Sequence, residues 1–158
     1  MNNELLKVDN LTKFFPVTEG LVLMKTVGHV QAVDHINFSI NEGETLGLVG
    51  ESGCGKTTTS KLILRLETPT EGAVYLNGQD IQEFKGAQLK EYRTQVQAVF
   101  QDPWSSLSPR MRVKDVVSEA LTVNRDVTDQ EKMDRVAEVL DQVGLHICLL
   151  YTSDAADE

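Results

Sequence analysis

The N-terminal part of the chain alternates between apolar and polar residues, which is the spacing expected of half-buried β-strands. Residues 5–8 and 30–40 follow this pattern, and the apolar positions of the second segment are Val33, Ile36, Phe38 and Ile40. Residues 18–29 lie between them and mix glycine, charge and short apolar stretches. This middle segment predicts a loop or a loose hairpin.

A second group of elements follows a turn at residues 41–43. The apolar run 45–49 predicts a strand, and residues 57–66 predict a helix. Glu71-Gly72 predicts a turn, and residues 73–76 predict a strand. Asn77-Gly78 then predicts a tight hairpin turn, because both residues tolerate positive φ angles.

The pattern changes to helical periodicity in the second half of the chain. Residues 85–92 predict a short polar helix, and residues 96–100 predict an apolar strand. Val113, Val116, Val117 and Ala120 form one apolar helix face. A capping box at Thr128 and Glu131 predicts the start of another amphipathic helix, which carries Met133, Val136, Ala137, Leu140 and Val143 and ends at a glycine C-cap, Gly144.

The strand at 45–49 and the helix at 57–66 flank a phosphate-loop pattern. Gly50 to Thr57 reads GESGCGKT, of the form G-x-x-x-x-G-K-[ST]. In such a loop the backbone N–H groups and the helix N-terminus face one anion, the lysine reaches the β- and γ-phosphates, and the threonine hydroxyl can ligate Mg²⁺. Because the flanking elements match, we interpret the loop as a nucleoside triphosphate site rather than a chance match. Its candidate binding residues are Gly50, Glu51, Ser52, Gly53, Cys54, Gly55, Lys56, Thr57 and Thr58.

Composition narrows the class of protein. The 158 residues carry a formal net charge of −9, and the acidity argues against nucleic acid as a partner, because neutralising phosphates needs a basic face. No apolar run is long enough to span a bilayer, and the N-terminus lacks a signal-peptide pattern. These features predict a cytosolic chain. Its two cysteines, Cys54 and Cys148, give no disulfide framework.

Gln101 follows the predicted strand at 96–100. An amide at the end of a buried strand can contact a bound metal or an attacking water, although such a residue alone is more often a solvated cap. Its surroundings, Phe100-Gln-Asp-Pro103, together with GESGCGKT resemble the nucleotide-binding subunit of ABC transporters. The segments GHVQAVD at 28–34, EGETLGLVG at 42–50 and SLSPRM at 106–111 extend the resemblance to ATP-binding subunits of oligopeptide and dipeptide importers, over residues 4–146.

The resemblance implies a fold and roles for particular residues. The fold would be an incomplete α/β P-loop NTPase, with a β-rich N-terminal part, the P-loop strand and helix, and the start of a helical subdomain. Gln101 would be the Q-loop glutamine that touches Mg²⁺ and water, and residues 102–110 would face the transmembrane partner. Phe15 would stack on adenine, with Phe14 beside it; residue type alone leaves open that both are core residues. None of the histidines, His29, His35 and His146, matches the family's switch position or suggests a metal site.

The resemblance also implies cofactors and partners. These are ATP, Mg²⁺, permease subunits and a second nucleotide-binding subunit, with the protein held at the inner face of the cell membrane by the permease. The transported solute stays open.

The last eleven residues, 148–158, depart from the helical pattern and resemble a translated sequencing adapter. We therefore expect residues 1–147 to be the N-terminal part of a nucleotide-binding domain and the tail to be non-native. The sequence lacks an LSGGQ-type signature, a Walker B aspartate, a catalytic glutamate and a switch histidine. We therefore expect it to bind ATP far better than it hydrolyses it, and to expose an apolar sheet edge beside the P-loop strand.

Two other interpretations remain at this stage. A P-loop kinase or GTPase shares the phosphate loop, but it leaves residues 100–103 unexplained. A non-catalytic nucleotide-binding or regulatory module requires the tail at 148–158 to be genuine.

Overall fold

A computed structural model describes residues 3–19, 25–102, 107–108, 110–124 and 127–145. His146, the tail at 148–158 and part of the segment 102–110 lie outside the described residues. The chain divides into two compact units, residues 1–96 and 97–158, which are described separately below. Within the described residues, no helix is both long and apolar enough to cross a membrane.

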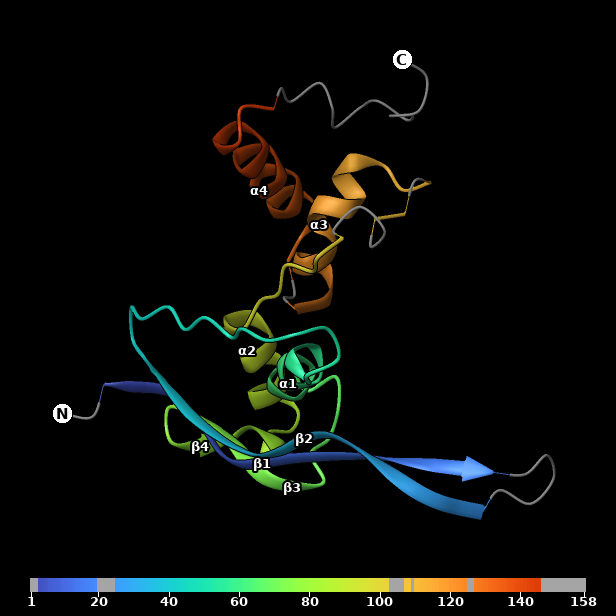
Figure 1. Ribbon diagram of the computed structural model, residues 1–158. Helices are drawn as coiled ribbons and strands as arrows, with labels where there is room; N and C mark the ends of the chain where they lie inside the picture. The colour runs from blue at the N-terminus through green and yellow to red at the C-terminus, as the bar shows by residue number, and fades with distance from the viewer. Residues whose placement is uncertain (1–2, 20–24, 103–106, 109, 125–126, 146–158) are drawn as a thin grey trace. The chain divides into compact units, whose positions relative to one another are not determined.

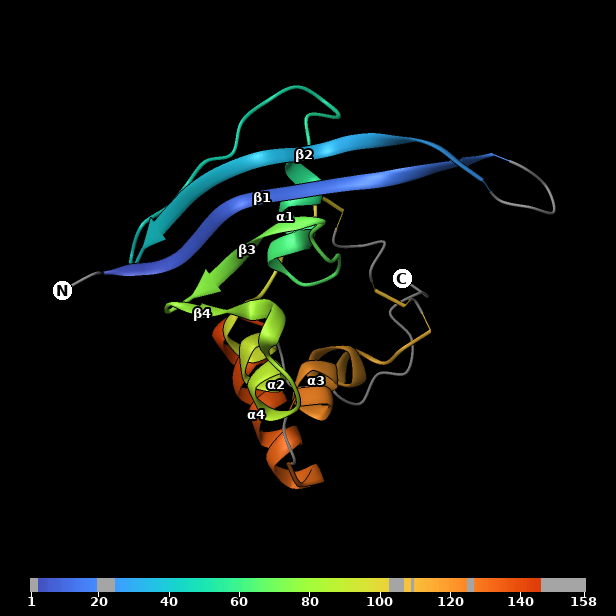
Figure 2. The same cartoon turned by 90° about the horizontal axis from the view of Figure 1, so that it is seen from below.

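The first unit is built on a four-stranded antiparallel sheet with strand order β2-β1-β3-β4 (Figures 1 and 2). The strands are β1 (Glu4–Glu19), β2 (Lys25–Asn41), β3 (Glu71–Leu76) and β4 (Gln79–Asp80). The tight turn predicted at Asn77-Gly78 is confirmed, since it joins β3 to β4 with φ angles of 50° and 77°.

Strands β1 and β2 form a longer hairpin than the sequence predicts. Residues 18–19 and 25–29 belong to the strands, so of the two alternatives given for 18–29 the hairpin, and not the loop, holds for them. Cross-strand pairs such as Phe15 with Val30 continue the ladder into this arm, and aromatic pairs with β-branched residues stabilise antiparallel strands. The turn expected at Glu71-Gly72 is also wrong, because β3 begins at Glu71.

Two helices lie on one face of this sheet (Figure 1). They are α1 (Lys56–Ile63) and α2 (Ala87–Gln95), and a 3₁₀ turn, η1 (Ile81–Glu83), precedes α2. Their apolar side chains form one core with the strands, whose buried members are Leu6, Val8, Leu11, Val33, Leu62, Val74, Leu76, Ile81, Phe84 and Tyr92. The predicted helices over 57–66 and 85–92 are therefore present, with shifted ends.

The strands predicted at 45–49 and 96–100 are not formed, which corrects the sequence interpretation. Val49 is 92% exposed and Val99 is 91% exposed, and Leu46, Leu48 and Phe100 are exposed too. A strand exists only where its N–H and C=O groups pair with a neighbour, and no described strand pairs with either segment. The apolar sequence alone therefore does not produce strands here.

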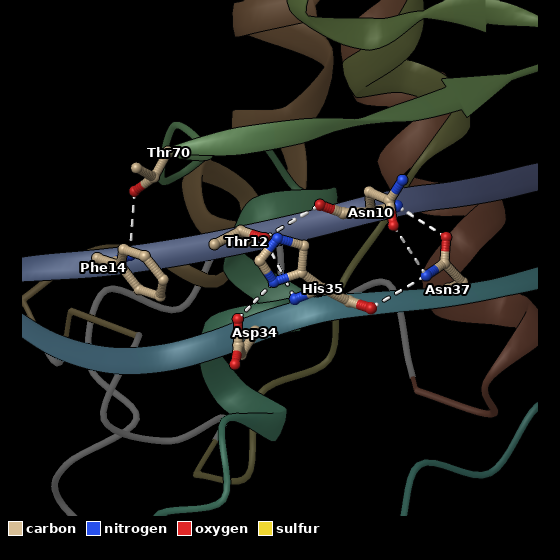
Figure 3. Close-up of polar contacts among 7 residues, drawn as sticks. All are labelled: Asn10, Thr12, Phe14, Asp34, His35, Asn37 and Thr70. Carbon is tan, nitrogen blue, oxygen red and sulfur yellow. Dashed lines mark hydrogen bonds and ion pairs between the residues drawn. The ribbon is translucent and has the colours of Figure 1, made fainter.

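The β1–β2 ladder is interrupted at a pair of left-handed residues. Asn10 and His35 both have φ of 47°, and the register shifts between Val8 and Leu11. The Asn37 side chain accepts from the Asn10 backbone N–H at 2.8 Å and donates to the His35 carbonyl at 3.0 Å (Figure 3). The buried Thr12 hydroxyl accepts from the His35 N–H at 3.2 Å. These bonds satisfy backbone groups that the irregular ladder leaves unpaired.

In the described part of the second unit, the helices are α3 (Val113–Asn124) and α4 (Asp129–Gln142). The capping box at Thr128 and Glu131 is confirmed, and hydrogen bonds from Thr128 lower the pKa of Glu131. Gly144 has φ of 73°, as expected for a C-cap. Val136 and Leu140 are buried against Val113, Val117, Met133 and Ala137, whereas Val143 is exposed and does not belong to the predicted apolar face.

Candidate phosphate-binding site

The predicted phosphate loop leads directly into α1, which begins at Lys56. Gly53 and Gly55 have φ of 86° and 92°, values that L-residues rarely adopt. A β-carbon on Gly55 would lie 2.3 Å from the Ala32 carbonyl oxygen in β2. Glycine at this position therefore allows the start of α1 to lie directly against the hairpin.

The Lys56 ammonium is held by the loop itself. Its Nζ donates to the carbonyl oxygens of Gly50 and Glu51, each at 2.7 Å, and lies 3.4 Å from the Cys54 Sγ. These contacts reach from Gly50, the first residue of the loop, to Cys54. The loop thus curls around the Lys56 ammonium, and no carboxylate among the described residues pairs with it, so its charge is available to an anion.

The hydroxyl groups of α1 differ in their hydrogen bonds. The Thr59 hydroxyl is buried and donates to the Gly55 carbonyl at 3.0 Å, and the Ser60 hydroxyl donates to the Lys56 carbonyl at 3.1 Å. Thr57 is exposed, and no described residue forms a hydrogen bond with its side chain. The predicted role of the Thr57 hydroxyl as a metal ligand stays a prediction.

The N-terminus of α1 carries no compensating negative charge. Its first turn contains no acidic residue, so the partial positive charge of the helix end is available to an anion. A pocket of about 330 Å³ borders the loop, lined by Gln31, Ala32 and Asp34 of β2 and by Cys54 and Lys56. The phosphate loop therefore lies at the edge of a hollow formed with the hairpin.

Phe15 lies on β1, paired with Val30 and one step along the ladder from Gln31. Neither Phe14 nor Phe15 belongs to the buried core; both rings are half-buried. The Lys13 Nζ lies 4.8 Å from the centroid of the Phe15 ring. The structure therefore places Phe15 on the same hairpin as the pocket, with a cation against one face of its ring.

Gln101 belongs to the second unit, whereas the phosphate loop belongs to the first. Gln101 is exposed and does not end a buried strand, because residues 96–100 form none. Its predicted contact with Mg²⁺ stays a prediction. The His35 Nδ1 lies 2.6 Å from the Asp34 carboxylate, and among the described residues no group of histidine, cysteine and acidic side chains could hold a metal.

Sequence reasoning missed residues whose contribution depends on contacts across the fold. Ala32 supports the start of α1, and Lys13 contacts both the Phe15 ring and residues 67–68. No short motif marks these positions, because each depends on a partner distant in sequence.

Comparison with known proteins agrees with this geometry. A sequence model described as "ABC transporter" matches residues 33–154. The oligopeptide transport ATP-binding proteins AppF and OppF of Bacillus subtilis are each 43% identical to this chain, over 90% and 92% of it. The matched regions are 43% and 46% of those proteins, so the chain spans less than half of their length. The dipeptide transport ATP-binding protein DppF of Lactococcus lactis is 48% identical over 75% of the chain and 39% of its own length.

Solved structures show the same fold. A dimeric bacterial ABC transporter cassette matches with a TM-score of 0.65 and 27% identity, over 89% of this chain and 58% of the cassette. The post-hydrolysis dimer of an ATP-binding cassette bound to ADP and phosphate matches with a TM-score of 0.70 over 97% of this chain and 63% of that one. At 24% identity, that second match supports the fold alone.

The fold and the loop therefore define a P-loop NTPase of the ABC cassette type, of which the chain covers a part. The match over residues 33–154 also identifies the family. The chain belongs to the ABC transporter family.

Proposed function

We propose that this chain binds MgATP through residues Gly50–Thr58, as part of the ATP-binding subunit of an ABC transporter that imports peptides. The observation that carries the proposal is the position of Lys56, whose ammonium donates to the carbonyl oxygens of Gly50 and Glu51 and lies against the Cys54 Sγ. A triphosphate would replace these neutral acceptors with charged oxygens, which form stronger hydrogen bonds.

Each part of the site has a distinct role in this proposal. The loop and the N-terminus of α1 hold the phosphates, and Lys56 neutralises their charge. Thr57 supplies a hydroxyl ligand for Mg²⁺, and Gln101 supplies an amide. Mg²⁺ would add neutralising charge at the phosphates. Phe15 contributes a ring on which adenine stacks.

The process that ATP binding would serve, and the partners of the subunit, are proposed from the names of the relatives. The names of AppF, OppF and DppF support peptide import as the process that ATP energises. Partner permease subunits, a second cassette, attachment to the inner face of the membrane and hydrolysis by the whole protein belong to the same proposal. The dimeric cassettes among the solved structures support the pairing of two subunits.

Calorimetric titration of the chain with MgATP tests the nucleotide site. Lys56→Met should weaken binding about 10- to 100-fold, as expected for loss of charged hydrogen bonds. Lys61→Met is the matched control, because Lys61 is exposed on the same helix and should leave the affinity unchanged. GTP should compete slightly less well than ATP, since ring stacking discriminates weakly between bases. Equal affinity of the wild type and Lys56→Met would contradict the proposed site.

The extent of the domain is a proposal of its own. We propose that residues 1–147 are the N-terminal part of the nucleotide-binding domain and that 148–158 are not native. Sequencing the gene with an independent library chemistry tests this. An open frame that runs past residue 147 into a signature and a Walker B strand is the expected result, and a stop codon after Glu158 would contradict it.

A further inference from the structure

We infer that Lys13 is a positioning residue for the nucleotide base: it holds the Phe15 ring so that one face is covered and the other is presented to a planar ligand. The inference rests on the proposed function, in which Phe15 stacks on adenine. It assigns the orientation of that ring to a lysine that no motif identifies.

The Lys13 ammonium is fixed by three contacts. It lies 4.8 Å from the Phe15 ring centroid, within the range of cation–π attraction. It also donates to the Thr68 carbonyl at 2.8 Å and pairs with the Glu67 carboxylate at 3.3 Å. The Lys13 side chain is only 15% exposed, so water screens these contacts weakly. Two oxygen partners therefore hold the cation in place independently of the ring.

The segment that supplies those oxygens is itself bonded to β1. The Thr70 N–H donates to the Thr12 carbonyl at 2.8 Å, and the Phe14 N–H donates to the Thr70 hydroxyl at 3.0 Å (Figure 3). Pairing of β3 with β1 ends at Thr12, so these bonds extend the support of β1 towards Phe15. Residues 67–70 thus hold both the strand and the cation.

A ring with a cation on one face has one face left for stacking. An aromatic ring attracts a cation through its negatively charged face, so Lys13 restrains Phe15 in one orientation before the nucleotide arrives. Pre-ordering a side chain lowers the entropy cost of binding. Loss of the charge should therefore weaken binding of the base and spare binding of the phosphates.

The experiment separates base from phosphates by using two probes, MgATP and magnesium tripolyphosphate. Lys13→Met keeps a long apolar side chain but removes the charge, and it should weaken MgATP binding about two- to fivefold, because the Phe15 ring is kept and only its restraint is lost. Tripolyphosphate affinity should stay unchanged. Lys13→Arg should restore MgATP binding, and Lys13→Met combined with Phe15→Ala should bind MgATP no more weakly than Phe15→Ala alone.

Lys7→Met is the matched control. The Lys7 Nζ lies 5.7 Å from the Tyr75 ring and pairs with Asp9 at 2.9 Å, a similar arrangement elsewhere on the sheet. It should change the affinity for neither probe.

The outcomes distinguish the role of Lys13 from the stacking of adenine on Phe15, on which that role rests. If Phe15→Ala weakens MgATP binding and Lys13→Met does not, stacking stands and the role of Lys13 is wrong. If Lys13→Met weakens both probes equally, Lys13 is a general structural residue and the inference is wrong. If Phe15→Ala changes nothing, stacking on Phe15 fails and the inference fails with it, while the Lys56 titration still judges the phosphate site.

Discussion

Gly55 and Ala32 approach so closely that a β-carbon on the glycine would lie 2.3 Å from the alanine carbonyl oxygen. Gly55 is the last residue before α1, and Ala32 is on β2, so this contact joins the phosphate loop to the hairpin. The hairpin also carries Phe15. The close approach therefore relates the two parts of the proposed nucleotide site within one unit.

Gly55→Ala should disrupt the site through this contact. The backbone must shift to relieve the overlap, and φ of 92° is already unfavourable for alanine. We expect MgATP affinity to fall more than about tenfold, which corresponds to more than about 1.4 kcal/mol. Gly43→Ala is the control, since Gly43 has φ of 76° but nothing within 4 Å of a β-carbon; it should cost about 1–2 kcal/mol of stability and leave affinity intact. Equal affinity losses in the two variants would show that the contact with Ala32 is unimportant.

Cys54 offers a chemical probe of the loop. It is a free, exposed thiol, and its Sγ lies 3.4 Å from the Lys56 Nζ. A nucleotide bound in the loop should cover this thiol, so MgATP should slow alkylation of Cys54 by iodoacetamide, followed by mass spectrometry. Lys56→Met should lose the protection at the same nucleotide concentration. Identical rates with and without MgATP in the wild type would count against nucleotide in the loop.

Asn37 should matter to stability more than its exposed position indicates. Its side chain bonds the backbone of Asn10 and of His35, the two left-handed residues of the hairpin. Asn37→Ala should cost about 1–3 kcal/mol, because three hydrogen bonds are lost. Asn37→Asp keeps the acceptor for the Asn10 N–H and loses the donor to His35, so urea denaturation should place it between Asn37→Ala and the wild type. A value at or below that of Asn37→Ala would show that the acceptor contributes nothing.

Tyr92 predicts a pH effect at the alkaline end. Its hydroxyl donates to the Ile63 carbonyl, and burial raises the pKa of Tyr92 from 10.0 to about 12, with a smaller opposing effect from Arg65. The folded protein therefore keeps this proton at pH values where the unfolded chain releases it. The contribution of Tyr92 to stability is complete below pH 10 and is lost as the pH rises towards 12.

Tyr92→Phe should remove this pH dependence. At pH 8 the variant should be less stable by about 1 kcal/mol, the value of one hydrogen bond. The difference from wild type should shrink between pH 10 and 11.5 in urea denaturation, since the other tyrosines are present in both proteins. A constant difference across that range would mean that Tyr92 titrates alike in the folded and unfolded chains.

The phosphate loop could be predicted from sequence because its information is local. The spacing of Gly50, Gly55, Lys56 and Thr57 predicts a loop that leads into a helix, and α1 does begin at Lys56. The capping box at Thr128 is equally local. The strands expected at 45–49 and 96–100 failed for the opposite reason. Apolar side chains favour a strand, but the strand itself needs a hydrogen-bonding neighbour, which the sequence of the segment does not contain.

The role of Lys13 is likewise not predictable from the local sequence of the candidate site. Phe15 could be proposed from a family resemblance, yet nothing near it in sequence indicates that residues 67–68 would hold its neighbouring lysine. That contact exists because α1 returns the chain to β1 after the phosphate loop. The residues that orient a site are thus harder to predict than those that form its motif.

Helix α1 has a consequence for which ligands the protein can accept. The helix is eight residues long, so it rises about 12 Å. The phosphate loop precedes the helix, and residues 67–70, which bind Lys13 and β1, follow it. In the proposed function, the helix thus fixes the spacing between the phosphate loop and the segment that holds Lys13 against the Phe15 ring. Inserting or deleting one residue in α1 would displace one from the other by about 1.5 Å and rotate it by roughly 100°. The site would then select its ligand by length. A molecule whose planar group and phosphates are separated by a different distance would contact either the ring or the phosphate loop, but not both.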